Sequence, residues 1–193
     1  MARIEDLLRG IAADQAGLVT AKQAAADGIS PMQLVLLERR GRLERAARGL
    51  YSLATWPSDE LRQYHFATLW PQSHRALRYA VVSHESAIEL YNLTQLNPGV
   101  VHVTVPRKTR ISRDIPAWLR LHFEDIDDRD RTFERGVPVV SIPLAIEELA
   151  PYGTDLVHRA VSEARERRLL REDELARLSG RFGSVILEPY RAE

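Results

Sequence analysis

Two helix-start signals in close succession constrain the fold of the N-terminal part of the chain most. Residues 20–23 read Thr-Ala-Lys-Gln and residues 30–33 read Ser-Pro-Met-Gln. Each matches a capping box, in which a hydroxyl and a Gln side chain accept from each other's backbone N–H groups. The pair Asp27-Gly28 between them predicts a turn, and Gly41 predicts the end of the second helix. Two short helices joined by a glycine-containing turn are typical of a helix-turn-helix.

The flanking residues extend this pattern to a winged domain. Residues 4–11 carry Ile and Leu at helical spacing, which predicts a first helix on the N-terminal side. Residues 43–53 indicate a strand, a tight turn and a second strand directly after the second helix, which is the position of a wing. Arginines are concentrated in this part of the chain, at Arg39, Arg40, Arg42, Arg45 and Arg48. We therefore predict a winged helix-turn-helix DNA-binding domain over residues 1–56.

The arginines favour DNA as the ligand of this domain. Arginines on a wing can contact phosphates or enter a minor groove, and they release counterions when they do so. On the second helix, Gln can recognise adenine and Arg can recognise guanine. A small helical domain used for protein contact is the alternative. The predicted DNA-binding residues are Ser30, Gln33, Arg39, Arg40, Arg42, Arg45 and Arg48.

The second helix of this motif is apolar over most of its circumference. One apolar face has to pack on the preceding helices, and we expect Met32, Val35 and Leu36 to supply it. Leu34 and Leu37 then lie nearer the surface, where they could contact thymine methyl groups, another domain or a second copy of the protein.

Residues 57–193 are predicted to form a larger partner-binding domain. Short apolar runs predict strands at 79–83, 100–105, 118–123, 137–141 and 185–187. Helical patterns occupy 58–70, 84–91 and 143–149, and most of the remainder, while residues 124–136 are a polar stretch. The expected fold class is α+β, or mixed α/β, with a small sheet covered by helices. Parallel and antiparallel strand orders both remain open.

Composition excludes several classes of protein. The chain has 193 residues, no cysteine and a formal net charge of zero, so disulfides and thiol nucleophiles are excluded and any DNA contact has to come from a local basic patch. The charged N-terminus does not resemble a signal peptide, and no run approaches the roughly 20 apolar residues of a membrane span. A cytoplasmic protein with no membrane association is expected.

The sequence offers no pattern for catalysis. It contains no Walker loop, no Gly-x-Gly-x-x-Gly and no Gly-x-Ser-x-Gly. His102 and His122 lie on predicted strands and could be neighbours in a sheet, but half-exposed packing residues are the expectation. The acidic residues of 124–130 alternate with arginines, which indicates a solvated, charge-paired loop. We predict no enzyme activity, no catalytic residue, no metal and no cofactor.

Several short segments resemble the AbiEi family of antitoxins. They are residues 17–20, 41–45 and 48–53 in the N-terminal part, and residues 82–87, 103–106, 139–143 and 145–149 in the larger domain. The resemblance implies an antitoxin of a two-gene system whose toxin is a nucleotidyltransferase-like enzyme. It implies that the winged domain represses the promoter of its own operon and that the C-terminal domain neutralises the toxin, directly or functionally.

Two other functions remain open at this point. The larger domain could sense a small ligand in a stand-alone winged-helix regulator, or it could be a nuclease fused to the winged domain. The basic loop with Arg107, Lys108, Arg110 and Arg113 could serve DNA or a protein partner, although a solvated loop is the simpler expectation. The oligomeric state is not indicated.

Overall fold

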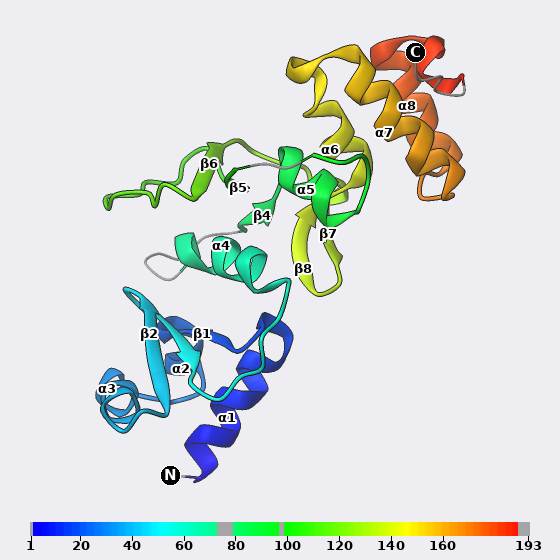
Figure 1. The fold of residues 1–193 in the computed structure, drawn as a ribbon. Helices are drawn as coiled ribbons and strands as arrows, with labels where there is room; N and C mark the ends of the chain where they lie inside the picture. Colours follow the sequence, from blue (N-terminus) through cyan, green and yellow to red (C-terminus); the bar gives the residue numbers. More distant parts are fainter. Residues whose placement is uncertain (1, 73–78, 97–98, 189–193) are drawn as a thin grey trace.

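The N-terminal part of the protein folds as a winged helix-turn-helix (Figure 1). The structure is a computed structural model, and it describes residues 2–72, 79–96 and 99–188. Three antiparallel strands form a sheet in the order β1-β3-β2. The elements are α1 (Ala2–Ala12), β1 (Leu18–Thr20), α2 (Ala21–Ala26), α3 (Pro31–Arg39), β2 (Leu43–Ala47) and β3 (Leu50–Leu53).

Both predicted capping boxes are present. At the start of α2, the Gln23 N–H donates to the Thr20 hydroxyl at 3.1 Å, and the Gln23 side chain accepts from the Thr20 N–H at 2.9 Å. Ser30 and Gln33 make the same reciprocal pair at the start of α3. These local bonds explain why two short helices begin where the sequence indicates.

The larger domain is built on a five-stranded mixed sheet in the order β6-β5-β4-β8-β7. The pairs β5/β6 and β4/β8 are parallel, whereas β4/β5 and β7/β8 are antiparallel. The strands are β4 (Val81–Val82), β5 (Val101–Val105), β6 (Leu119–Phe123), β7 (Arg131–Glu134) and β8 (Val137–Val140). The helices are α4 (Arg62–Gln72), α5 (His84–Leu90), α6 (Ile142–Glu147), α7 (Thr154–Glu166) and α8 (Glu172–Phe182). The predicted mixed α/β class, with helices covering a small sheet, is confirmed.

Helix α4 lies between the two sheets and belongs to the cores of both (Figure 1). Its Leu69 packs with Leu18 and Leu50 of the small sheet, while Trp70 packs with strands of the large sheet. Arg62 adds polar contacts, because its guanidinium donates to the Ala16 carbonyl and to the Ser52 hydroxyl, both at 2.7 Å. The predicted boundary after residue 56 therefore precedes a helix that both cores share.

Two expectations for the larger domain were wrong. The polar stretch 124–136 contains strand β7, which pairs with β8 through a two-residue turn whose central residues, Arg135 and Gly136, both have positive φ. That geometry is typical of a tight hairpin. The strand escapes detection because it lies at an edge and leaves Phe133 70% exposed. Residues 185–187 belong to the 3₁₀ segment η4 (Ser184–Leu187), since Ile186 packs into a core formed with α7 and α8 rather than against a sheet.

Over the residues that the structure describes, no helix is both long enough and apolar enough to cross a membrane.

Candidate nucleic-acid interface

The exposed face of α3 is the opposite of the one that the sequence suggested. Leu34 and Leu37 are 0% and 3% exposed and pack in the core of the winged domain, whereas Met32 is 81% exposed. Val35 and Leu36 are also exposed. The apolar residues of α3 lie all around its circumference, so their spacing alone does not predict which face is buried. The buried face is the one that packs against α1, Ile29 and Leu43.

The exposed face of α3 ends at a basic residue, Arg39. Met32, Val35, Leu36 and Arg39 are spaced i, i+3, i+4 and i+7, so they lie along one stripe of α3. All four side chains are exposed. The spacing of these residues is visible in the sequence and predicts a face packed in the core, but in the structure this face is exposed. An apolar stripe ending in a guanidinium can enter a major groove, where the apolar groups contact thymine methyls.

Ser30 and Gln33 lie at the start of α3, where they are engaged in its cap. The Ser30 N–H donates to the Gln33 side-chain oxygen at 2.7 Å, and the Gln33 N–H donates to the Ser30 hydroxyl at 3.3 Å. A bidentate contact of Gln33 with adenine needs its side-chain oxygen as well as its nitrogen. Such a contact would therefore have to open the capping box.

The five arginines lie at the end of α3 and on the hairpin that follows it. Arg39, Arg40, Arg45 and Arg48 are exposed. Arg42 is also exposed, but its guanidinium lies 3.5 Å from the Glu5 carboxylate. The structure therefore places all five predicted arginines on one continuous segment of the winged domain, and their role in DNA binding stays a prediction.

The tip of the wing contacts the basic loop that follows β5. Arg113 stacks over Trp70 at 3.6 Å from the ring centre, and its guanidinium donates to the carbonyl oxygens of Trp70 and Arg48. Burial lowers the pKa of Arg113, and the positive charge of Arg48 lowers it further. The expectation of a simply solvated loop was wrong at Arg113, which holds the loop against the wing.

A cluster of three histidines in the larger domain was only partly foreseen. His102 and His122 are neighbours, as their positions on predicted strands suggested, with Nδ1 of His102 3.0 Å from Nε2 of His122. No sequence pattern indicates that His84 joins them, because it lies at the start of α5 rather than on either strand. Burial, together with a smaller effect of the neighbouring histidines, lowers the pKa of His84 to about 3 and that of His122 to about 4. These two rings are therefore neutral at neutral pH.

Comparisons with known proteins bear on the two parts of the chain differently. Residues 6–54 match the model of a family described as transcriptional regulator, AbiEi antitoxin. The match confirms the resemblance over the winged domain and supports a DNA-binding regulatory role for it. No curated protein matches the sequence.

A solved structure has a similar fold. The chain is similar to the crystal structure of the RV2827C protein from Mycobacterium tuberculosis, with 15% sequence identity and a TM-score of 0.51. The similarity covers 96% of this chain and 76% of that one. At this identity the likeness concerns the fold alone, and it includes the larger domain that the family model leaves unmatched.

Proposed function

We propose that the protein is a transcriptional autorepressor and antitoxin. In this proposal the winged domain, residues 1–56, binds the promoter of its own operon, and residues 57–193 neutralise a nucleotidyltransferase-like toxin. The observation that carries the DNA-binding half is the exposed stripe of α3 that ends at Arg39 and is followed by a wing with Arg45 and Arg48. That arrangement lies in the segment that matches a family of regulators and antitoxins.

The two kinds of exposed side chain have different roles in this proposal. The arginines of the wing contact phosphates, which fixes the orientation of the protein but carries no sequence information. Met32, Val35 and Leu36 face the base edges, where apolar contact with thymine methyls supplies part of the specificity. Because Gln33 is engaged in its cap, Arg39 and Arg40 are the groups we expect to read guanine.

The salt dependence of DNA binding tests the phosphate contacts. Each neutralised phosphate contributes about −0.9 to the slope of log affinity against log salt. Arg45→Ala with Arg48→Ala should therefore make the slope on the operon's promoter fragment less negative by about 1.8. The matched control is Arg129→Ala with Arg171→Ala, which removes the same charge from exposed positions of the larger domain. An equal change in both double variants would mean that overall charge, not contact, sets the slope, and the assignment would be wrong.

Co-expression tests the second half of the proposal. Cells that express the gene adjacent in the operon should stop growing, and the full-length protein should restore growth. The full chain is preferable to residues 57–193 alone, because α4 shares a core with the winged domain. The Arg45→Ala, Arg48→Ala variant should still restore growth when it is expressed from a foreign promoter. Failure of the wild-type protein to restore growth would overturn neutralisation and leave DNA binding untouched.

A ligand-sensing role for the larger domain is the second candidate, and one observation favours it. A cavity of about 490 Å³ lies beside α6 and α8, and charged side chains, among them Glu147, Glu148, Arg177 and Arg181, dominate its lining. Its volume is that of an ordinary small-molecule pocket, and its charges suit a polar ligand. A polar metabolite that raises the melting temperature and changes promoter affinity, with no toxin gene involved, would support this alternative.

A further inference from the structure

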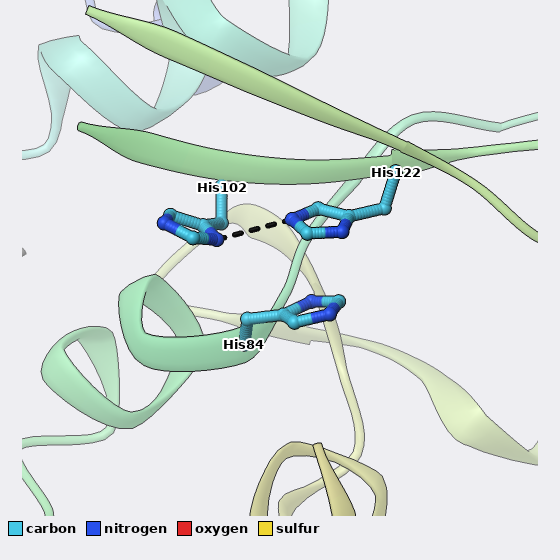
Figure 2. Close-up of side chains that lie close together, drawn as sticks. All are labelled: His84, His102 and His122. Carbon is cyan, nitrogen blue, oxygen red and sulfur yellow. Dashed lines mark hydrogen bonds between the residues drawn. The ribbon is translucent and has the colours of Figure 1, made fainter. Parts of the chain in front are cut away.

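Three histidine side chains from three separate elements meet on one face of the large sheet (Figure 2). In the parallel register of β5 and β6, His102 lies opposite Arg120 and His122 lies opposite Thr104. His102 and His122 are thus diagonal neighbours, and Figure 2 shows their rings side by side above the sheet-facing end of α5. His84 is the first residue of α5, and it brings the third ring to the same place.

The nitrogen atoms of these rings converge. Nδ1 of His102 lies 3.0 Å from Nε2 of His122, and one nitrogen from each of the three rings lies within 4.8 Å of the others. The His84 ring stacks on that of His122, with 3.6 Å between their centres. Four ligands at about 2.0–2.1 Å around a tetrahedral ion are about 3.3 Å apart, so the spacing between His102 and His122 is already close to that of co-ligands.

A carboxylate oxygen adds a fourth possible ligand to the three ring nitrogens. Oε2 of Glu85 lies 3.2 Å from Nδ1 of His102, which is again the spacing of co-ligands. This oxygen is buried, and within the described part of the chain it makes no hydrogen bond. A single proton on His102 Nδ1 can be directed at His122 or at Glu85, but it cannot satisfy both acceptors well. A cation at the centre would satisfy all of them.

The backbone holds His84 in place at a conformational cost. Its φ is +55°, a left-handed conformation that residues other than glycine rarely adopt. The His84 N–H donates to Oε2 of Glu148 at 2.6 Å, and this contact stabilises the conformation. Strained backbone of this kind persists where the surrounding structure imposes it, and it concentrates at functional sites.

We propose that His84, His102, His122 and Glu85 form a binding site for a divalent transition-metal ion, of which Zn²⁺ is the representative. Imidazole nitrogens with one carboxylate are a ligand set that suits zinc and its neighbours in the first transition row, whereas magnesium and calcium prefer oxygen ligands alone. The site is separate from the winged domain, so it does not depend on the DNA-binding proposal.

Binding requires one movement. Stacked rings hold their in-plane lone pairs in two nearly parallel planes, so the His84 ring has to turn out of its stack with His122 to direct a lone pair at a shared ion. A cavity of about 490 Å³ borders His84 and leaves its ring room to turn. Rotation about the side-chain torsions leaves the backbone of α5 in place.

The first test uses the untagged full-length protein, freed of metal and titrated with zinc against a coloured chelator. We expect one zinc ion per chain with a dissociation constant below about 1 μM, and a Co²⁺ complex with the intense visible bands of tetrahedral coordination. In the NMR spectrum of the wild-type protein, zinc should shift the ring signals of His84, His102 and His122. The other three of the six histidines should not respond. No binding at 10 μM zinc, or a response confined to the other histidines, would overturn the proposal.

Variants then identify the ligands. His102→Gln and His122→Gln should each weaken zinc binding by more than about 100-fold, because even outer-shell partners of a metal contribute about 10- to 100-fold. His84→Asn should do the same, and asparagine tolerates positive φ, so this variant keeps the fold. Glu85→Gln should weaken binding by at least about tenfold. His158→Gln is the matched control, since His158 lies on α7 with its ring bonded to the Glu188 carbonyl.

Each variant has to be compared with the wild type in its metal-free state by circular dichroism and melting temperature. A folded His84→Asn protein with wild-type zinc affinity would show that His84 is not a ligand and would overturn the three-histidine site. Equal losses in His158→Gln and in the cluster variants would assign the bound zinc to surface histidines and would also overturn it.

Discussion

The guanidinium of Arg113 lies over the indole ring of Trp70, 3.6 Å from its centre, and reaches the carbonyl of Arg48 at 3.4 Å. Arg113 follows β5 in the larger domain, Trp70 belongs to α4, and Arg48 lies at the tip of the wing. One side chain therefore joins the wing to the larger domain. Arg107, Lys108 and Arg110 belong to the same loop, so the contacts of Arg113 anchor the end of a basic loop beside the wing.

Replacing Arg113 should loosen this junction. We expect Arg113→Ala to lower the free energy of unfolding by about 1–2 kcal/mol, from the lost cation–π contact and hydrogen bonds. Arg113→Lys keeps the charge but not the planar donor group, so its stability should fall almost as far while the salt slope of DNA binding stays at the wild-type value. Urea unfolding and anisotropy titrations measure the two effects, and a wild-type unfolding energy for Arg113→Ala would contradict the role of the stack.

Leu34 and Leu36, two residues apart on α3, should respond oppositely to the same substitution. Leu34 is fully buried, so Leu34→Ala should cost about 2–5 kcal/mol of stability by leaving a cavity. Leu36 is 40% exposed, so Leu36→Ala should change stability by less than about 0.5 kcal/mol. If the exposed stripe contacts bases, Leu36→Ala should weaken binding to the operon's promoter by about 1 kcal/mol, roughly fivefold, with an unchanged salt slope.

The measurements separate the two roles clearly. Thermal unfolding reports the packing of each leucine, and competition between promoter and random DNA reports base contact. Equal affinity of Leu36→Ala and the wild type for the promoter would mean that the stripe does not reach the bases.

Local signals in the sequence predicted the winged domain well, and tertiary packing explains what they missed. Capping boxes and turn residues act within a few positions, so residues 20–23 and 30–33 located α2 and α3 correctly. The predicted orientation of α3 was wrong because it depends on packing against α1, Ile29 and Leu43, which lie elsewhere in the winged domain. Strand β7 was missed because an edge strand needs no apolar alternation.

The histidine cluster illustrates the same limit at a candidate site. The sequence predicts that His102 and His122 lie on strands that could be neighbours, but it does not predict the parallel register of those strands. His84 reaches them only because β4 pairs with β5 and α5 starts directly afterwards. Contacts between residues 18 to 38 positions apart follow from strand order, which short apolar runs do not specify.

Gly17 and Gly28 offer a matched test of a close contact in the winged domain. Both have nearly the same positive φ, +78° and +77°. A Cβ on Gly17 would lie 2.6 Å from Cβ of Trp56, whereas a Cβ on Gly28 would meet nothing within 4 Å. Gly28→Ala should therefore lower the free energy of unfolding only by the cost of a left-handed backbone at an alanine, about 1–2 kcal/mol. Gly17→Ala should cost at least about 1 kcal/mol more, because overpacking adds to it.

A second substitution separates the two contributions at Gly17. Trp56→Gly removes both the Cβ and the ring that the new methyl group would meet, so Gly17→Ala should cost no more in that background than Gly28→Ala does in the wild type. Melting temperatures of the four proteins provide the cycle. A Gly17→Ala protein as stable as Gly28→Ala in the wild-type background would show that Trp56 moves aside at no cost.

Asp130 should make stability depend on pH in the acid range. Its burial opposes ionisation, but hydrogen bonds from Arg177 and Ser141, both at 2.7 Å, outweigh that effect and lower its pKa below the ordinary 3.8. The unfolded chain therefore takes up this proton at a higher pH than the folded protein does. The stabilisation is complete above the unfolded pKa and is lost as the pH falls through the lower, folded pKa.

Asp130→Asn removes this dependence while keeping the shape of the side chain. We expect the variant to be less stable than the wild type by about 1–3 kcal/mol at pH 7, the range for hydrogen bonds to a charged group. That difference should shrink as the pH falls below about 4, where the wild-type carboxyl becomes protonated in the unfolded chain first. Asp127→Asn is the control, because Asp127 is 75% exposed and pairs only at 3.7 Å with Arg129. Urea unfolding of the three proteins between pH 2.5 and pH 7 gives the comparison, and a difference that stays constant over this range would mean that the Asp130 carboxylate contributes nothing through its charge.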